Sequence, residues 1–143
     1  MDTFISRSPE ETRALGESWG KAATTGLVIG LTGDLGAGKT ELVKGVARGL
    51  AIKDKVLSPT FALIHEYSGG RLPLFHIDLY RLESASQIIG AGLEEYFYRP
   101  AGVTVVEWIE RWGKCFDVST PGSEYRHVAI ETVSETERRI ICQ

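Results

Sequence analysis

The chain has 143 residues, a formal net charge of −3 and a pI of about 5.6. It contains no apolar run of the roughly 18 residues that a transmembrane helix requires, and its first residues lack the basic and apolar regions of a signal peptide. We therefore expect a cytoplasmic protein without a membrane partner, folded as one domain over residues 1–143.

Charge and cysteine content indicate how the protein meets nucleic acid and in which state its thiols are. A protein that holds RNA or DNA by itself usually carries a basic face, and this sequence has no basic run. Any role in a nucleic-acid pathway is therefore expected to be indirect, through a protein partner. The two cysteines, Cys115 and Cys142, lack metal-ligand spacing and are expected to be reduced thiols.

The N-terminal region predicts a short strand and then a helix. Residues 3–6 have strand character, and Ser8-Pro9-Glu10-Glu11 is a strong helix start. Ser8 is expected as the N-cap, Pro9 at the first helical position and Glu11 as the closing member of a capping box. The apolar stripe of this helix is expected at Leu15, Trp19 and Ala22. Such a helix either packs on the core, which we favour, or lines a pocket beside the motif that follows it.

That motif is a glycine-rich loop between a strand and a helix. The apolar run Leu27–Thr32 is of strand length, and apolar residues recur at helical spacing from Leu42 to Leu50. Between them stands G-x-x-x-x-G-K-T, the phosphate-binding P-loop, formed by Gly33, Asp34, Leu35, Gly36, Ala37, Gly38, Lys39 and Thr40. Glycines let backbone N–H groups curl around an anion, and the helix N-terminus adds its dipole. Lys39 is expected to reach the terminal phosphates, and the Thr40 hydroxyl to bind Mg²⁺.

The rest of the chain predicts further strands and helices. Strands at 62–67 and 72–80 flank the turn Ser68–Arg71 and form an antiparallel hairpin. Broken helical pieces are expected over 84–98, a buried strand over 103–106, a short helix over 109–116 and a final hairpin from 125–132 and 137–141. The predicted fold is a single-domain α/β sandwich of the P-loop NTPase type. Its sheet is mixed, with a parallel core and antiparallel hairpins, and helices flank it.

Two acidic residues follow predicted strands. Asp78 and Glu107 are expected at the carboxyl ends of their strands, the edge where ligands bind in open α/β sheets. At least one is expected to bind Mg²⁺ or to orient the attacking water. The alternatives without a functional role are that Asp78 is solvated and that Glu107 begins a helix. His76 alternates with Asp78 and is interpreted as a half-buried structural histidine in preference to a nucleotide contact.

Other polar residues near the loop leave alternatives open. Thr60, in Ser58-Pro59-Thr60-Phe61, lies either in a structural turn, which spacing favours, or in a switch-like loop. The cations Arg81, Arg99 and Arg111 are candidates to stabilise transition-state charge, and spacing does not choose among them.

In combination these motifs resemble the bacterial TsaE (YjeE) family. The resemblance rests on the P-loop, Ser58–Phe61, His76-Ile77-Asp78-Leu79-Tyr80-Arg81-Leu82, Gly92–Phe97 and Val106-Glu107-Trp108, in that order. It implies an ATPase, weak on its own, that binds ATP or ADP with Mg²⁺. It also implies association with the TsaB–TsaD heterodimer, which transfers threonylcarbamoyl to adenosine 37 of tRNAs that read codons beginning with A; hydrolysis would support turnover of that complex.

The resemblance also assigns residues. It implies phosphate and magnesium roles for Lys39 and Thr40, a Walker-B-like place for Asp78 and a second acid near the metal for Glu107. It puts Thr60 in a switch-like loop and Trp108 near the nucleotide or the partner. Glu41 occupies a nucleotide-contacting position where many members carry a hydroxyl, so its carboxylate is expected to turn to solvent. Ile109 stands where a proline is frequent.

Alternative functions are a P-loop small-molecule kinase and a nucleotide-gated, non-catalytic assembly factor. No insertion long enough for a kinase lid separates the motifs, and the N/T-K-x-D element with which GTPases read guanine is absent from the sequence. The retained acids Asp78 and Glu107 argue against a non-catalytic factor.

Overall fold

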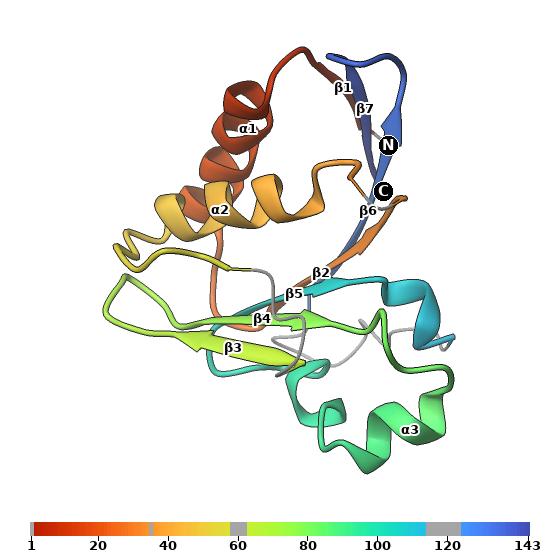
Figure 1. The fold of residues 1–143 in the computed structure, drawn as a ribbon. Helices are drawn as coiled ribbons and strands as arrows, with labels where there is room; N and C mark the ends of the chain where they lie inside the picture. Colours follow the sequence, from red (N-terminus) through yellow and green to blue (C-terminus); the bar gives the residue numbers. More distant parts are fainter. Residues whose placement is uncertain (1, 35, 58–62, 114–123) are drawn as a thin grey trace.

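The structure, a computed structural model, describes residues 2–34, 36–57, 63–113 and 124–143. A seven-stranded sheet separates two helical layers (Figure 1). Helices α1 (Pro9–Ala22) and α2 (Lys39–Gly49) cover one face, and α3 (Ala85–Gly90) lies on the other with the short 3-10 helices η1 (Glu94–Tyr96) and η2 (Ile109–Arg111). The predicted α/β sandwich is confirmed.

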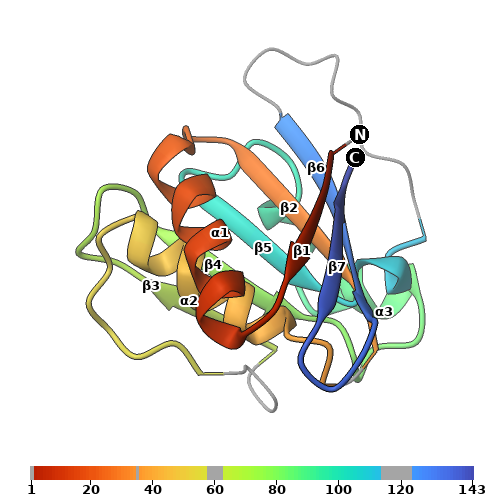
Figure 2. The same ribbon diagram turned by 90° about the horizontal axis from the view of Figure 1, so that it is seen from above.

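The strand order is β1-β7-β6-β2-β5-β4-β3 (Figure 2). The strands are β1 (Asp2–Ser6), β2 (Leu27–Thr32), β3 (Ile64–Tyr67), β4 (Leu74–Asp78), β5 (Val103–Glu107), β6 (Glu124–Thr132) and β7 (Arg138–Cys142). The central strands β6, β2, β5 and β4 run parallel, whereas β3, β7 and β1 pair antiparallel. Both predicted hairpins form, and the C-terminal one joins the parallel core through β6 beside β2.

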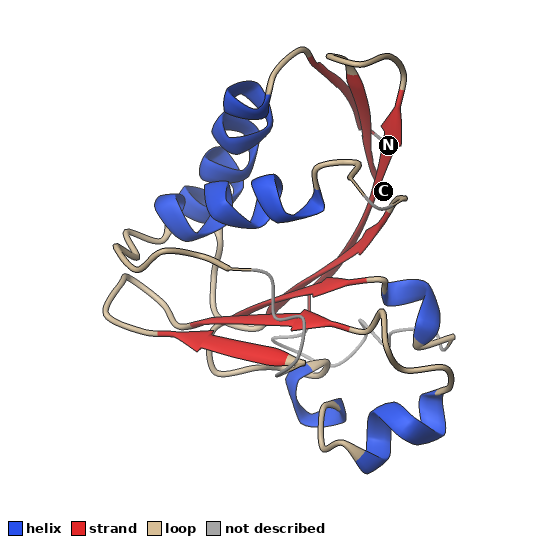
Figure 3. Cartoon of the chain, viewed as in Figure 1, coloured by secondary structure: helices blue, strands red, loops and turns tan. Residues whose placement is uncertain are grey.

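The sheet is buried on both faces, as parallel sheets usually are. One core lies under α1 and α2 and includes Ile29, Leu31 and Val105; the other lies under α3 and includes Val28, Ile77 and Val106. Figure 3 shows the two layers of helices on either side of the strands. Residues that alternate along a strand therefore point to opposite layers, which decides which side chains reach α2.

The predicted apolar stripe of α1 is wrong in part. Its buried line is Thr12, Gly16 and Gly20, whereas Ala22 is exposed and Leu15 and Trp19 are partly buried. A Cβ on Gly16 would lie 3.0 Å from the Val46 backbone nitrogen and 3.2 Å from the Gly45 Cα of α2. The two helices thus pack backbone against backbone, which only residues without a side chain permit.

Other boundaries differ modestly from expectation. The connection between β3 and β4 covers residues 68–73, so it is longer than the predicted four-residue turn. The predicted helix over 109–116 is only η2 within the described residues, and Trp108 precedes it in the left-handed region at φ 61°. The Ser8 hydroxyl accepts the Glu11 amide N–H at 3.1 Å, which confirms the N-cap. Among the described residues, no helix combines the length and apolar character needed to span a membrane.

Candidate functional site

The loop after β2 leaves its backbone at Gly36 and Gly38 open to a ligand. Gly33, Gly36 and Gly38 have φ of 151°, 78° and 105°, in the region that favours glycine. A Cβ on Gly36 or Gly38 would meet no heavy atom within 4 Å, so open space lies in front of them. Gly38 caps α2 without any side-chain hydrogen bond, and the first N–H groups of α2 are left for a ligand. Leu35 lies outside the described residues.

Lys39 is folded back over this loop. Its Nζ donates to the Asp34 carbonyl at 2.9 Å and also to the Gly33 carbonyl, and it lies 4.4 Å from the centroid of the Trp108 ring. The residue is only 5% exposed. Burial lowers the pKa of Lys39, although the carboxylates of Glu107, Glu110 and Asp78 oppose that shift. The ammonium thus lies where an anion held by the loop would meet it.

Asp78 and Glu107 are neighbours at the carboxyl edge of the sheet. They are register partners in the parallel β4–β5 pair, and both fall on the face that α2 covers. Burial raises the pKa of Asp78, and the Tyr80 amide, which donates to Oδ1 at 2.9 Å, counteracts this. The structure therefore brings together the two acids that were predicted separately from strand ends.

His76 has a partner that spacing did not reveal. Its Nε2 lies 2.5 Å from Glu107 Oε2, and both side chains are buried, at 0% and 5% exposure. Since a carboxylate only accepts hydrogen bonds, Nε2–H is the donor. The expected half-buried histidine is thus fully buried, and it holds one oxygen of Glu107 in place.

These groups line a cleft of about 440 Å³, here called the carboxylate cleft. Its lining residues are Gly36, Gly38, Lys39, Thr40, Glu41, Asp78, Tyr80, Arg81, Glu107 and Trp108. Tyr80 and Trp108 are in contact, with ring centroids 5.1 Å apart and planes tilted by 47°, and the Arg111 guanidinium lies 5.7 Å from the Trp108 ring centre. Trp108 therefore lines the cleft beside Lys39.

The donors in this cleft fit magnesium. A hydroxyl at Thr40 and carboxylates at Asp78 and Glu107 are the oxygen ligands that Mg²⁺ prefers, together with water and substrate phosphates. Among the described residues, no group of three or more His, Cys, Asp or Glu side chains forms a complete metal site. An ion here would depend on phosphate oxygens for its remaining ligands.

Glu41 does not turn to solvent as expected. Its side chain is 27% exposed, and its carboxylate accepts from the Arg13 guanidinium and from Lys44 Nζ at 3.2 Å. Burial raises the pKa of Glu41, but the hydrogen bonds from Arg13 and Lys44 outweigh it, so the pKa is lowered overall. The carboxylate is therefore a charged group tied to α1.

A second cleft, of about 350 Å³, lies on the other side of the loop. This hairpin cleft is lined by Arg7, Ser8, Pro9, Thr12, Gly36, Ala37, Gly38, Glu41, Glu135, Thr136 and Arg138. Arg138 Nε donates to the Ala37 carbonyl at 3.1 Å, which ties the β6–β7 hairpin to the loop. The N-terminus of α1 lines this cleft, whereas most of the helix packs on α2, so each of the two alternatives offered for this helix holds for part of it.

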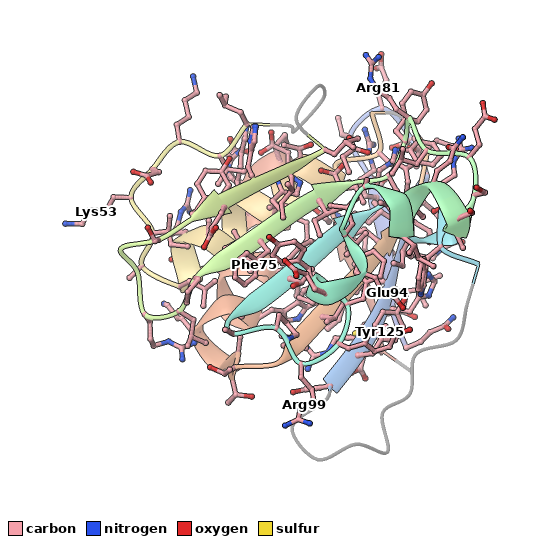
Figure 4. All side chains as sticks on the ribbon, turned by 90° about the horizontal axis from the view of Figure 1, so that it is seen from below. Lys53, Phe75, Arg81, Glu94, Arg99 and Tyr125 are labelled. Atoms are coloured by element: carbon pink, nitrogen blue, oxygen red, sulfur yellow. The ribbon has the colours of Figure 1, made fainter. Side chains whose placement is uncertain are left out.

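The three candidate arginines separate in space. Arg81 lines the carboxylate cleft and Arg111 lies behind Trp108. In Figure 4, Arg99 lies at the opposite end of the molecule from Arg81. Arg99 is thus removed from the candidates. Thr60 and the rest of its loop lie outside the described residues.

Comparison with known proteins identifies the relatives of this chain. A family model described as "Threonylcarbamoyl adenosine biosynthesis protein TsaE" matches residues 6–140. Proteins named tRNA threonylcarbamoyladenosine biosynthesis protein TsaE are 49% identical over 114 residues in Nostoc sp. and 50% identical over 101 residues in Bacillus subtilis. These alignments cover 78% and 71% of this chain, and 70% and 62% of the relatives.

A relative of the same name from Aquifex aeolicus is 36% identical over 144 residues, covering 98% of this chain and 94% of the relative. The crystal structure of Bacillus subtilis YdiB superposes with a TM-score of 0.76 at 35% identity, covering 97% of this chain and 82% of that one. The fold similarity thus extends over nearly the whole chain.

Proposed function

The chain belongs to the TsaE family of threonylcarbamoyladenosine biosynthesis proteins, and from this premise we propose that it binds and hydrolyses ATP for tRNA modification. In this function the chain is a Mg²⁺-dependent ATPase that acts with the TsaB–TsaD heterodimer and supports its turnover. One observation carries the catalytic part: the open glycine loop, Lys39 and the adjacent pair Asp78 and Glu107 meet in one cleft.

The phosphates bind in the loop. The amides of Gly36, Gly38 and the first turn of α2 surround the phosphate chain, and Lys39 leaves the Gly33 and Asp34 carbonyls to neutralise it. Thr40 and Asp78 would hold Mg²⁺, which would offset the charge that develops on the terminal phosphates. Glu107, oriented by His76, positions the attacking water.

The nucleoside is proposed to lie in the hairpin cleft. The carboxylate cleft and the hairpin cleft share Gly36, Gly38 and Glu41, so a phosphate chain in the loop has one cleft at each end. Since the acids and the metal serve the terminal phosphates, the ribose and base extend the other way, between α1 and the β6–β7 hairpin. This direction supports ATP as a ligand that uses both clefts.

The partner is proposed to complete the site. Of the described arginines, Arg81 alone lines the carboxylate cleft, so at most one arginine of this chain faces the terminal phosphates. A further cation from the TsaB–TsaD pair would raise a rate that is slow without it, as in P-loop enzymes whose transition-state cation comes from a partner. The net charge of −3 supports tRNA contact only through the TsaB–TsaD pair.

The test is ATP hydrolysis by the purified chain, alone and with the TsaB–TsaD pair, with Lys39→Ala as the blank. We expect a low rate alone that rises in the complex. A hydrolysis rate that does not change when the TsaB–TsaD pair is added would still fit a P-loop ATPase but would contradict the proposed partner.

Glu107→Gln separates the catalytic function from the assembly-factor alternative. The variant keeps the shape and removes the charge, so ATP binding should persist while hydrolysis and multiple-turnover tRNA modification fall. Full modification by a variant that binds ATP without hydrolysing it would favour a nucleotide-gated assembly factor.

A further inference from the structure

Glu41 introduces a negative charge into the proposed phosphate site. It stands in the first turn of α2 and lines both clefts, so it lies beside the phosphate chain of the proposed nucleotide. A carboxylate free to turn toward that chain would repel it. The inference below rests on the proposed binding of ATP.

Because α1 packs tightly on α2, the Arg13 side chain reaches the Glu41 carboxylate. A Cβ on Gly45 would lie 2.8 Å from the carbonyl carbon and 2.9 Å from the Cα of Arg13, so the Arg13 backbone lies directly against Gly45. Glu41 stands one turn before Gly45 on the same helix, and residues four apart share a face. The Arg13 guanidinium therefore reaches Glu41 Oε2 across the helix pair.

The remaining charges around Glu41 are less well placed. Lys44 pairs with Oε1 at 3.2 Å, but its side chain is 38% exposed against 21% for Arg13. Glu10, the second partner of Arg13 at 3.0 Å, is 75% exposed. A solvated pair contributes little, so Arg13 is the principal group that neutralises and orients Glu41.

We propose that Arg13 is a positioning residue for nucleotide binding, which holds the Glu41 carboxylate turned away from the phosphates. Arg13 lines neither cleft, so its effect on the nucleotide passes through Glu41. With Arg13 in place, α2 can bind phosphate at its N-terminus although its first turn carries the Glu41 carboxylate.

The experiment measures the Kd of MgATP by calorimetry. Arg13→Met keeps the long apolar stem, which packs beside α2, and removes the charge. We expect about a tenfold weaker Kd, the size of a partly screened unit charge. Glu41→Gln in the same chain should restore the Kd to within about twofold of the wild-type value, and Arg13→Lys should weaken it by less than about threefold.

Controls separate charge from packing. Lys44→Ala is expected to weaken binding by about twofold or less, and Glu10→Gln to leave it unchanged. The loss in Arg13→Met should shrink in about 1 M salt, where screening extends only about 3 Å, whereas damage to helix packing would persist. Thermal unfolding of each variant reports that packing directly.

Two results would overturn the proposal: a folded Arg13→Met variant with wild-type affinity, or a loss that Glu41→Gln does not restore. If Arg13→Met alone does not fold, the single variant Glu41→Gln is compared with the double variant Arg13→Met/Glu41→Gln. The MgATP affinities of these two proteins must then agree within about twofold. Wild-type protein that fails to bind MgATP would refute the proposed function itself, which distinguishes the two failures.

Discussion

Gly45→Ala tests the helix packing on which the site depends. The added Cβ would lie 2.8 Å from the Arg13 carbonyl carbon, closer still to its oxygen, where ordinary contact begins at 3.4 Å. The obstacle is backbone and cannot rotate aside as a side-chain end would. Helices α1 and α2 must therefore move apart locally by about 0.6 Å or more.

The expected cost follows from two opposing effects. Overpacking of a close interface costs about 1–3 kcal/mol, and alanine gains about 1 kcal/mol over glycine in a helix interior. Because the misfit is between backbones, we take the upper part of the first range. The expected net loss is about 1–2 kcal/mol of unfolding free energy, a fall in Tm of about 3–8 °C for a domain of this size.

The assay is urea unfolding followed by circular dichroism, with thermal unfolding in parallel. Gly90→Ala is the matched control, because Gly90 ends α3, is exposed and has nothing within 4 Å of the added Cβ. It should leave stability unchanged or raise it slightly. If Gly45→Ala is as stable as the wild type, the two helices do not pack as closely as described, and the delivery of Arg13 to Glu41 loses its basis.

Four further predictions concern the site and the core. Lys39→Ala should weaken ATP binding by about 100-fold or more, because the phosphate charge is left uncompensated; an unchanged Kd by calorimetry would refute the loop assignment. Asp78→Asn should reduce Mg²⁺-dependent hydrolysis while leaving metal-free nucleotide binding nearly intact, and equal losses in both assays would indicate a folding defect. His76→Gln, which retains a donor for Glu107, should keep a higher kcat than His76→Leu at similar KM; equal kcat values would remove the positioning role of His76. Burial raises the pKa of Tyr125 to about 12 from 10.0. The stabilisation that comes from burying the neutral phenol is therefore full below pH 10 and is lost as the pH rises through 12. Tyr125→Phe should flatten the dependence of Tm on pH over that interval, and an unchanged slope would contradict this.

The local features of the site followed from the sequence. The 33–40 loop, the strand before it and the helix after it were predicted because glycine spacing, a strand-length apolar run and helical periodicity are all short-range signals. The Ser8 N-cap was predicted for the same reason, since its partner Glu11 lies three residues away. Asp78 and Glu107 were placed correctly at strand ends, because their preceding apolar runs mark where each strand stops.

Two of the errors arose where one helix met another. The stripe Leu15, Trp19 and Ala22 was chosen because large apolar residues usually face a core. Only the approach of α2 shows that Gly16 and Gly20 form the buried line of α1. Glu41 was expected in solvent for a similar reason, since nothing near it in the sequence indicated that Arg13 would come within reach.

Pairings between distant residues were decided by the tertiary structure alone. The Asp78–Glu107 register, the hydrogen bond from His76 to Glu107 and the Arg13–Glu41 ion pair each join segments that are about 30 residues apart. The hairpin cleft depends on a longer separation, because Arg138 meets Ala37 only when β6 adds in parallel beside β2. The sequence by itself determined which chemical groups the site contains, since motif and periodicity are local properties. Strand order and helix packing decided which of those groups face one another, because such contacts depend on the path of the whole chain.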